Sequence, residues 1–165
     1  MTRPERFDPT AIFASLASHG VEFVLIGGLA SGARGAGWPT FDADILILGN
    51  EENLERLGRA LTDLMAEYDT LHRPPIRPTA ERLRTFTGPQ LFRTRYGRLD
   101  VLKEAGGETY ESLLPDSSLI ELHSHQLRCA SIEALLRMKL AANRPKDAAG
   151  IIKLREALRR RESRD

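Results

Sequence analysis

Two aspartates, Asp42 and Asp44, stand one residue apart and directly before the apolar run Ile45–Leu48. Successive side chains of a β-strand point to opposite faces, so a strand through this segment places both carboxylates on one face. Aspartate is unfavourable in strands, and two like charges on one face repel each other. A hard cation such as Mg²⁺ offsets that cost, because it binds oxygen ligands from one or two carboxylates plus substrate phosphates. The other interpretation is a pair of solvated carboxylates at a strand end.

A third carboxylate, Asp100, lies inside the apolar segment Leu99-Asp100-Val101-Leu102. A core strand does not hold an unpaired carboxylate without a large cost. Asp100 therefore either pairs with an arginine or joins Asp42 and Asp44. Two carboxylates on one strand and one on a neighbour form a cradle for a pair of divalent ions, which stabilise the attacking and leaving oxygens in phosphoryl or nucleotidyl transfer.

A glycine-rich stretch follows the apolar run Val21–Ile26, which we interpret as a buried strand. Five of the eleven residues from Gly27 to Gly37 are glycine. Glycine permits positive φ and lets the backbone come close to a ligand, and free N–H groups at the start of a following helix favour phosphate. The alternative is an ordinary strand-to-helix turn.

Two late helices each direct one charge inward. Lys139 falls on the apolar stripe that begins at Ile132, and Asp147 extends backward the stripe that contains Ile151 and Leu154. The spacing is equally compatible with a structural Lys139–Asp147 salt bridge between packed helices. A buried ion pair adds little net stability, so a role in a functional site is a reasonable rival interpretation.

The elements that must position these residues alternate between helix and strand. Helices are expected over Pro9–His19, Glu51–Glu67, Ile132–Ala142 and Pro145–Arg160. Strands are expected over Val21–Ile26, Asp42–Leu48, Leu91–Tyr96 and Leu99–Lys103, and a strand pair or loop over Leu119–Ala130. Three prolines make His72–Pro78 a loop. This order predicts a mixed α/β or α+β domain.

Length and composition exclude several classes of protein. The chain has 165 residues, of which 41% are hydrophobic and 28% charged, as expected for a single globular domain. The single cysteine, Cys129, permits no intramolecular disulfide. The longest apolar run with glycines, Phe23–Ala30, is far shorter than the ~20 residues that a membrane span needs. With no apolar secretory signal visible, we expect a cytoplasmic protein without membrane association.

The net charge of +1 hides an uneven distribution. Residues 131–165 carry ten basic and five acidic side chains, so the remainder is acidic. A basic C-terminal end would attract a phosphate backbone, although a solvated, arginine-rich helix end explains it equally well. The phosphate-binding P-loop, the dinucleotide fingerprint, H-E-x-x-H, C-x-x-C and the G-x-S-x-G elbow are all absent from the sequence.

Three of these segments, in this order, resemble the DNA-polymerase-β-type nucleotidyltransferase superfamily. They are Leu25-Ile26-Gly27-Gly28, Thr40-Phe41-Asp42-Ala43-Asp44 and Leu99-Asp100-Val101-Leu102. The superfamily motif is a G-[SG] pair, a later D-x-D and a single Asp on a neighbouring strand. The resemblance is closest to the AbiEii-type branch, which includes toxins of toxin–antitoxin pairs and tends to show late segments like Ser131–Lys139 and Arg144–Asp147. It runs from about residue 20 to residue 155. Many members have Gly-Ser where this chain has Gly27-Gly28.

The resemblance implies a fold and a set of site residues. The fold would be α/β (α+β), a mixed β-sheet flanked by helices, in one domain over 1–165 with its catalytic core at about 20–130 and C-terminal helices at about 131–160 closing the site. The implied Mg²⁺ ligands and catalytic carboxylates are Asp42, Asp44 and Asp100. The implied nucleotide-binding residues are Gly27, Gly28, Ser31, Thr40 and Lys139, and Lys139 and Asp147 would complete the catalytic site.

Thr40 lies two residues before Asp42 and would share its face on a strand. We expect it to line the metal site. In the toxin branch a hydroxyl residue at this point can be a silencing site, and a phosphate on Thr40 would bring about −1.5 to −2 charge to the carboxylates. The plain alternative is a β-favouring threonine at the start of a strand.

The activity implied is Mg²⁺-dependent transfer of a nucleoside monophosphate from an NTP to an acceptor, with release of pyrophosphate. The toxin resemblance and the basic C-terminal end favour RNA, such as a tRNA 3′ end, as acceptor, and a cognate antitoxin as partner. A protein hydroxyl or a small antibiotic is an alternative acceptor. The rival functions are a catalytically idle binding or regulatory module and a two-metal nuclease or phosphohydrolase.

Overall fold

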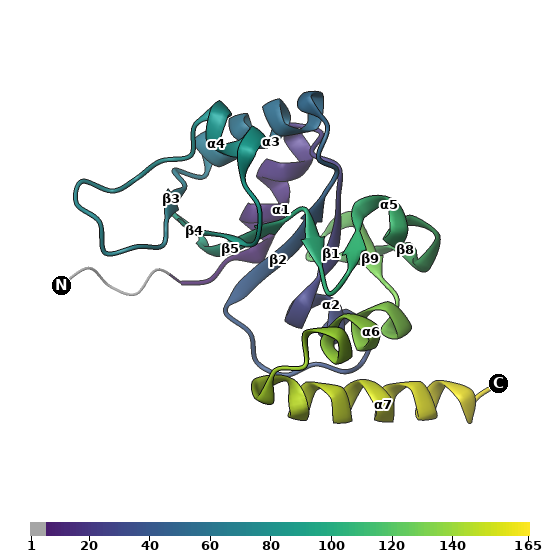
Figure 1. Ribbon diagram of the computed structural model, residues 1–165. Coiled ribbons are helices and arrows are strands. Elements are labelled where there is room, and N and C mark those ends of the chain that lie inside the picture. The colour runs from purple at the N-terminus through teal and green to yellow at the C-terminus, as the bar shows by residue number, and fades with distance from the viewer. Residues whose placement is uncertain (1–5) are drawn as a thin grey trace.

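A seven-stranded mixed sheet forms the centre of the computed structural model, which describes residues 6–165 (Figure 1). The strand order is β3-β4-β5-β2-β1-β9-β8. The strands are β1 (Phe23–Ile26), β2 (Asp42–Ile47), β3 (Glu67–Tyr68), β4 (Gln90–Thr94), β5 (Gly97–Leu102), β8 (Ser117–Leu122) and β9 (His125–Ala130). β2 pairs in parallel with β5, and β1 with β9, while the other neighbours are antiparallel. A short hairpin, β6 (Glu104–Ala105) and β7 (Glu108–Thr109), lies outside this sheet.

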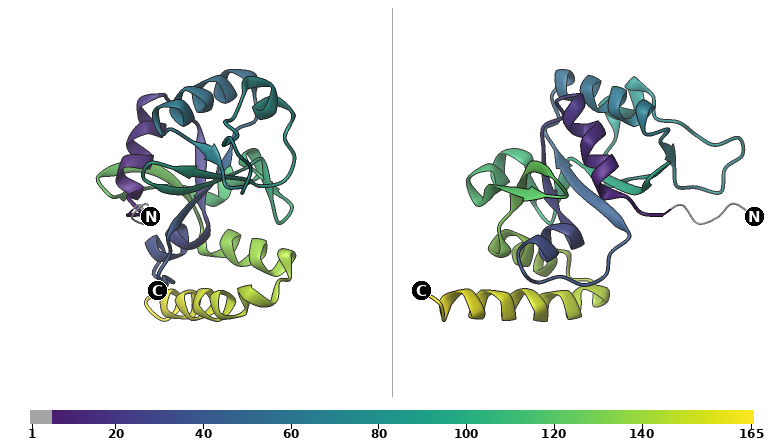
Figure 2. Two further views of the ribbon diagram at one scale, coloured as in Figure 1. Left: turned by 90° about the vertical axis from the view of Figure 1, so that its left-hand side faces the viewer. Right: turned by 180° about the vertical axis from the view of Figure 1, so that it is seen from behind.

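Helices lie on both sides of the sheet. They are α1 (Pro9–Ser18), α2 (Gly27–Ala33), α3 (Glu51–Asp63), α4 (Ala80–Thr85), α5 (Tyr110–Leu113), α6 (Ile132–Ala142) and α7 (Ala148–Glu162). The views in Figures 1 and 2 place α1, α3 and α4 together on one side and α6 and α7 together on the other. Side-chain caps fix several helix starts: Asp8 accepts from Ala11 N, and Asn50 from Asn53 N. Within residues 6–165, no helix has both the length and the apolarity to cross a membrane.

The alternation along β2 separates the core from the open face of the sheet. Ala43, Ile45 and Ile47 are buried, whereas Asp42 and Asp44 are only partly buried. The carboxylates therefore lie on the face away from this core, as the alternation in the sequence predicts. Further along the strand Leu46, on the face of the carboxylates, is buried as well. The mixed sheet flanked by helices confirms the expected fold class.

The structure differs from the sequence-based boundaries at the β4–β5 turn. We expected the turn at Gly97-Arg98, but it falls at Arg95-Tyr96, and Gly97 begins β5. The Thr94 hydroxyl closes this turn, because it donates to Gly97 O at 2.7 Å and accepts from Tyr96 N at 3.1 Å. Gly97 has a φ of +114°, which only glycine adopts easily.

The sequence analysis predicted none of the short elements β3, α4, β6, β7 and α5, and the helix expected over Glu51–Glu67 ends at Asp63, so that Glu67 begins β3. The helix α4 follows the predicted proline loop and is capped by Thr79, whose hydroxyl accepts from Arg82 N. The hairpin of β6 and β7 begins soon after β5. The segment expected as a strand pair or loop is a strand pair, β8 and β9, joined at His123-Ser124.

Candidate active site

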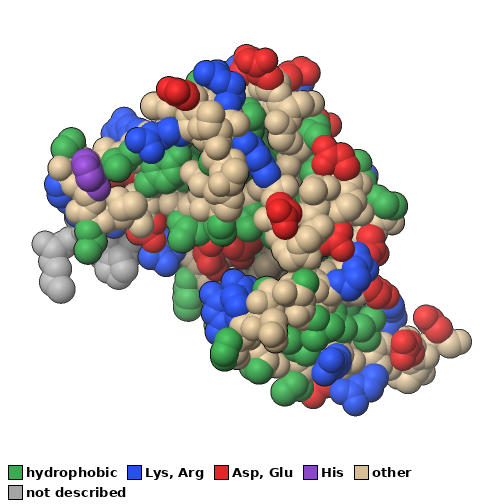
Figure 3. Space-filling model, viewed as in Figure 1, with side chains coloured by type: hydrophobic (Ala, Val, Ile, Leu, Met, Phe, Trp, Pro, Cys, Tyr) green, Lys and Arg blue, Asp and Glu red, His purple; other side chains and the backbone are tan. Residues whose placement is uncertain are grey.

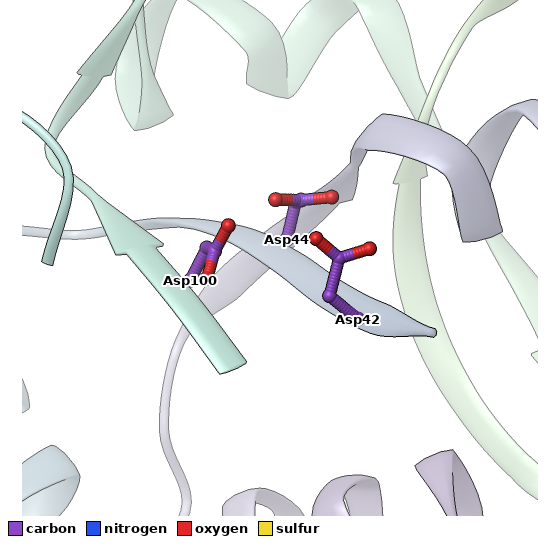
Figure 4. Close-up of side chains that lie close together, drawn as sticks. All are labelled: Asp42, Asp44 and Asp100. Atoms are coloured by element: carbon purple, nitrogen blue, oxygen red, sulfur yellow. The ribbon is translucent and has the colours of Figure 1, made fainter. Parts of the chain in front are cut away.

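The three aspartates meet on neighbouring strands in the middle of the sheet. Asp42 and Asp44 come from β2, and Asp100 comes from β5, where it is the register partner of Asp44. Each offers a carboxylate oxygen, and these oxygens all lie within 4.8 Å of one another. Figure 4 shows the three side chains directed toward a common space. The sheet register thus joins Asp100 to the other two rather than to an arginine.

Gly27 makes room for this cluster at the end of β1. Its φ of +72° is in the left-handed region, and a Cβ at this position would lie 2.2 Å from Asp44 Oδ2. Any side chain here would displace the carboxylate, so the glycine is required by close approach as well as by conformation. The helix α2 begins at Gly27 itself, with no intervening loop.

The electrostatics of the cluster are unfavourable without a cation. Burial, followed by the charges of Asp42 and Asp100, raises the pKa of Asp44 to about 8. Burial also raises the pKa of Asp100, although a hydrogen bond from Asp44 opposes this shift. The carboxylate oxygens of the three aspartates lie within 4.8 Å of one another, so their negative charges repel. Three hard oxygen donors at this spacing fit a hard divalent cation, whose charge would offset this repulsion.

A cavity of about 670 Å³ opens over the carboxylates. In Figure 3 it appears as a hollow with acidic side chains inside and basic side chains on the rim below. Five of the residues expected to bind nucleotide or to complete the catalytic site line this cavity: Gly27, Gly28, Thr40, Lys139 and Asp147. Its lining also includes side chains that the sequence did not single out for the site: Trp38, Pro89, Leu91, Leu102 and Glu104.

Lys139 and Asp147 form the ion pair that was one of the two interpretations of their spacing. Lys139 Nζ donates to Asp147 Oδ1 at 3.1 Å, and Arg144 Nε donates to Asp147 Oδ2 at 2.7 Å. Burial works to raise the pKa of Asp147, but these hydrogen bonds outweigh it and hold the pKa below its ordinary value. Lys139 and Arg144 also line the cavity, so the ion pair orients two cations at its wall.

Aromatic packing fixes the position of Lys139 from the other side. Its Nζ lies 5.1 Å from the centroid of the Trp38 ring, a cation–π distance. A Cβ on Gly150 of α7 would lie 3.0 Å from Trp38 Cη2 and 3.1 Å from Lys139 Cε. The loop before β2, the helix α6 and the helix α7 therefore meet at this lysine.

Thr40 and Ser31, the two hydroxyl residues of the expected site, have different positions. Thr40 Oγ1 lines the cavity and donates to Asp42 Oδ1 at 2.8 Å. It lies 3.0 Å from where a Cβ on Gly28 would be, so it fills the space beside that glycine. Ser31 is fully buried in α2, its Oγ has no hydrogen-bond partner within residues 6–165, and it is absent from the cavity lining. The structure does not bring Ser31 to the site.

The sequence matches no family model and no curated protein at a significant level. Solved structures of similar fold exist. The lincosamide antibiotic adenylyltransferase LnuA, with lincomycin bound, has a TM-score of 0.59 and 15% identity, over 92% of this chain and 99% of its own. The antibiotic-resistance factor ANT(2'')-Ia has a TM-score of 0.58 and 18% identity, over 89% of this chain and 78% of its own. A "putative nucleotidyltransferase" from Thermotoga maritima has a TM-score of 0.54 and 15% identity, over 98% of each chain. This chain therefore has the fold found in nucleotidyltransferases.

Proposed function

We propose that this protein is a nucleotidyltransferase that moves a nucleoside monophosphate from an NTP to an acceptor hydroxyl and releases pyrophosphate. The observation that carries the proposal is the carboxylate cluster of Asp42, Asp44 and Asp100 at the floor of a cavity with a basic wall. The shared fold with nucleotidyltransferases supports it. A two-metal nuclease needs the same carboxylates but gives no reason for Gly27-Gly28 at the end of β1.

The metal ligands in this proposal are the three aspartates, and the proposed ion is Mg²⁺. Mg²⁺ held there would neutralise the carboxylates and stabilise negative charge on the attacking and leaving oxygens. Thr40 holds one oxygen of Asp42, which leaves the other oxygen free for the ion. Gly27 keeps the space beside Asp44 clear.

Residues of the protein then have separate roles in the transfer. Asp100 accepts the proton of the acceptor hydroxyl, because its carboxylate lies in the cavity beside the other two aspartates. The acceptor oxygen forms a bond to the α-phosphorus as the bond to the bridging oxygen breaks. Lys139 and Arg144, oriented by Asp147, bind the departing pyrophosphate. The backbone at Gly28, which lines the cavity, would contact the triphosphate.

The shared fold does not identify the acceptor of the nucleotide or the partners of this protein. RNA, a cognate antitoxin and membership of the AbiEii-type toxin branch remain predictions from the sequence. Two of the structural neighbours are named for antibiotics, the lincosamide adenylyltransferase LnuA and the resistance factor ANT(2'')-Ia, which supports a small-molecule acceptor instead. A protein hydroxyl and a catalytically idle module are the remaining alternatives.

The test is label transfer together with NTP binding. The protein is incubated with Mg²⁺ and each common NTP labelled at the α-phosphate, with RNA, protein and small-molecule fractions as acceptors, and Mg²⁺–NTP binding is measured by calorimetry. We expect transfer that requires Mg²⁺ and disappears in Asp42→Ala. Asp63→Asn, an exposed carboxylate on α3 outside the cavity, is the control and should keep full activity. Absence of Mg²⁺–NTP binding by the wild-type protein would contradict the proposal.

A further inference from the structure

The cavity has two chemically different walls. The basic side chains in its lining are Lys139, Arg144 and Lys146, which all come from α6 and the turn that follows it. The same helix also contributes Leu135, Met138 and Ala142, so the presence of cations is what distinguishes this wall. The opposite wall comes from the β4–β5 end of the sheet and presents Pro89, Leu91 and Leu102. We name these three residues the apolar wall. Among the described residues that line the cavity, no basic side chain comes from this wall.

The strand register places this wall beside Asp100. Asp100 pairs with Asp44 on β2 and with Leu91 on β4. Partners across neighbouring strands point to the same face, so Asp100 lies between a carboxylate of the metal cluster on one side and a leucine on the other. Leu91 is 45% exposed even though its chain neighbour Phe92 is fully buried on the other face. A substrate that reaches Asp100 without crossing Asp42 and Asp44 therefore passes over Leu91.

Among the residues that line the cavity, the charges beside the apolar wall are acidic. Arg93 and Arg98 lie on the same face of β4 and β5 but outside this lining, and both form ion pairs with Asp69. Asp100 lies at one end of the apolar wall, and Glu104, which is exposed and also lines the cavity, lies just beyond Leu102 in the chain. A polyanion would meet these carboxylates on this side, whereas the cations that would bind phosphates stand on the opposite wall. RNA depends on basic contacts to its phosphates for most of its affinity. The triphosphate thus fits the basic wall, and the acceptor must fit the apolar one.

We propose that the acceptor is a small molecule, neutral or cationic, that lays an apolar face on the apolar wall and presents its hydroxyl to Asp100. This inference rests on the proposed nucleotidyltransferase function and names its substrate class. A cavity of about 670 Å³ is within the range of ~300–1,000 Å³ that holds drug-sized ligands. The hydroxyl proton passes to Asp100, the new oxygen–phosphorus bond forms, and pyrophosphate leaves, so the product is a nucleotidylated alcohol.

The chemical class of the acceptor is tested by dividing a cell extract into pools before the reaction. An extract of the source organism is divided into RNA, protein and two small-molecule pools, one that passes an anion exchanger and one that it retains. Each pool is incubated with the protein, Mg²⁺ and α-labelled NTP. We expect label in the pool that passes, and loss of that label when the pool is first depleted on a reversed-phase resin, which removes apolar compounds. Label only in RNA, in protein or in the retained pool, or in no pool, overturns the inference.

A matched pair of variants tests the wall itself. Leu91→Arg puts a cation on the apolar wall, whereas Leu119→Arg makes the same change on β8, where the leucine is 56% exposed and absent from the cavity lining. We expect Leu91→Arg to raise the KM for the pool acceptor about tenfold or more, with the KM for NTP and the melting temperature unchanged. Leu119→Arg should leave all three unchanged. Equal acceptor KM values for Leu91→Arg and wild type would overturn the inference.

Calorimetry separates this inference from the proposed function. If wild-type protein binds Mg²⁺–NTP and labels RNA, the transferase function stands and the small-acceptor inference is wrong. If it does not bind Mg²⁺–NTP, the proposed function itself fails. Leu91→Arg binding of Mg²⁺–NTP, measured in the same way, shows that the variant retains the folded nucleotide site.

Discussion

At the residue scale, Asp44 bears the largest electrostatic cost in the site. Its pKa is raised to about 8, chiefly by burial and then by Asp42 and Asp100. The folded protein therefore keeps a proton on Asp44 that the unfolded chain releases near pH 4. Because the folded state binds more protons in this window, Asp44 lowers stability progressively as the pH rises from about 4 to about 8.

We accordingly predict that Asp44→Asn raises the melting temperature of the metal-free protein at pH 8 and changes it little at pH 4. Relief of a buried, unpaired polar group is worth on the order of 1–3 kcal/mol, which is ~2–10 °C at this chain length. Added Mg²⁺ should raise the melting temperature of wild type at pH 8 but not that of the variant. Thermal denaturation in chelator-treated buffer measures both effects, and a variant less stable than wild type at pH 8 contradicts the prediction.

Thr40 is the second residue with a measurable role, as a positioning residue for Asp42. Thr40→Val removes the hydroxyl that donates to Asp42 Oδ1 and preserves the shape of the side chain. Loss of a hydrogen bond that orients a metal ligand typically lowers metal affinity about 10–100-fold. We expect this loss for Thr40→Val and near wild-type affinity for Thr40→Ser, measured by calorimetric titration with Mg²⁺ or Mn²⁺. Equal weakening in both variants would indicate a packing role against Gly28 instead.

The sequence predicted the carboxylates but not every hydroxyl contact. Alternation along a strand determines the face of Asp42 and Asp44, and the cost of a buried charge marks Asp100, so these three residues could be found without a structure. Ser31 could not be placed, because its position depends on where α2 begins. The helix starts directly at Gly27, and this carries Ser31 into the core rather than to the cavity.

At the element scale, the contact between α6 and the start of α7 depends on Asp147. This residue is 4% exposed, and its carboxylate joins Lys139 of α6 to Arg144 of the connecting turn. The stripes in the sequence placed Lys139 and Asp147 together but left open whether they form an ion pair or contact substrate. The structure shows the ion pair at the cavity wall, so the two interpretations are compatible.

We predict that Asp147→Asn destabilises the protein, because removing one partner leaves Lys139 inside the structure without its counter-charge. Breaking a buried pair from one side costs ~3–5 kcal/mol, and because Arg144 is largely exposed we expect the lower end of this range. Urea denaturation measures the change. Lys139→Met in the same background should recover part of the loss, and a double variant no more stable than Asp147→Asn would show that the pair is not the cause.

At the scale of the whole molecule, the sequence predicted the order of elements better than their arrangement. Each long strand and helix has a local pattern, and α1, α3, α6 and α7 were expected within a few residues of their bounds. The strand order β5-β2-β1-β9 joins segments distant in the chain, and no local pattern encodes it. The two walls of the cavity follow from that order, since β4 reaches Asp100 only through its pairing with β5.

The attachment of α7 to the rest of the protein gives a prediction that links packing to nucleotide binding. Gly150 in α7 and Gly58 in α3 are both glycines inside helices, where alanine is normally favoured by ~0.5–1 kcal/mol. A Cβ on Gly58 meets only Leu83 Cδ1, at an ordinary 3.6 Å, so Gly58→Ala should stabilise the protein slightly. A Cβ on Gly150 would press on Trp38 at 3.0 Å and on Lys139 Cε at 3.1 Å.

Gly150→Ala should therefore lose the expected helix gain and shift Lys139 at the basic wall. Because Lys139 is the proposed contact for the leaving phosphates, we expect Mg²⁺–NTP affinity to fall several-fold, a loss on the order of 1 kcal/mol. Mg²⁺ affinity in the absence of NTP should not change, because the carboxylate cluster lies on β2 and β5. Calorimetric titrations of both variants, with and without NTP, measure this difference. If Gly150→Ala bound Mg²⁺–NTP as tightly as Gly58→Ala, the docking of α7 would have no part in holding the nucleotide, and the basic wall would have to act through Arg144 and Lys146 alone.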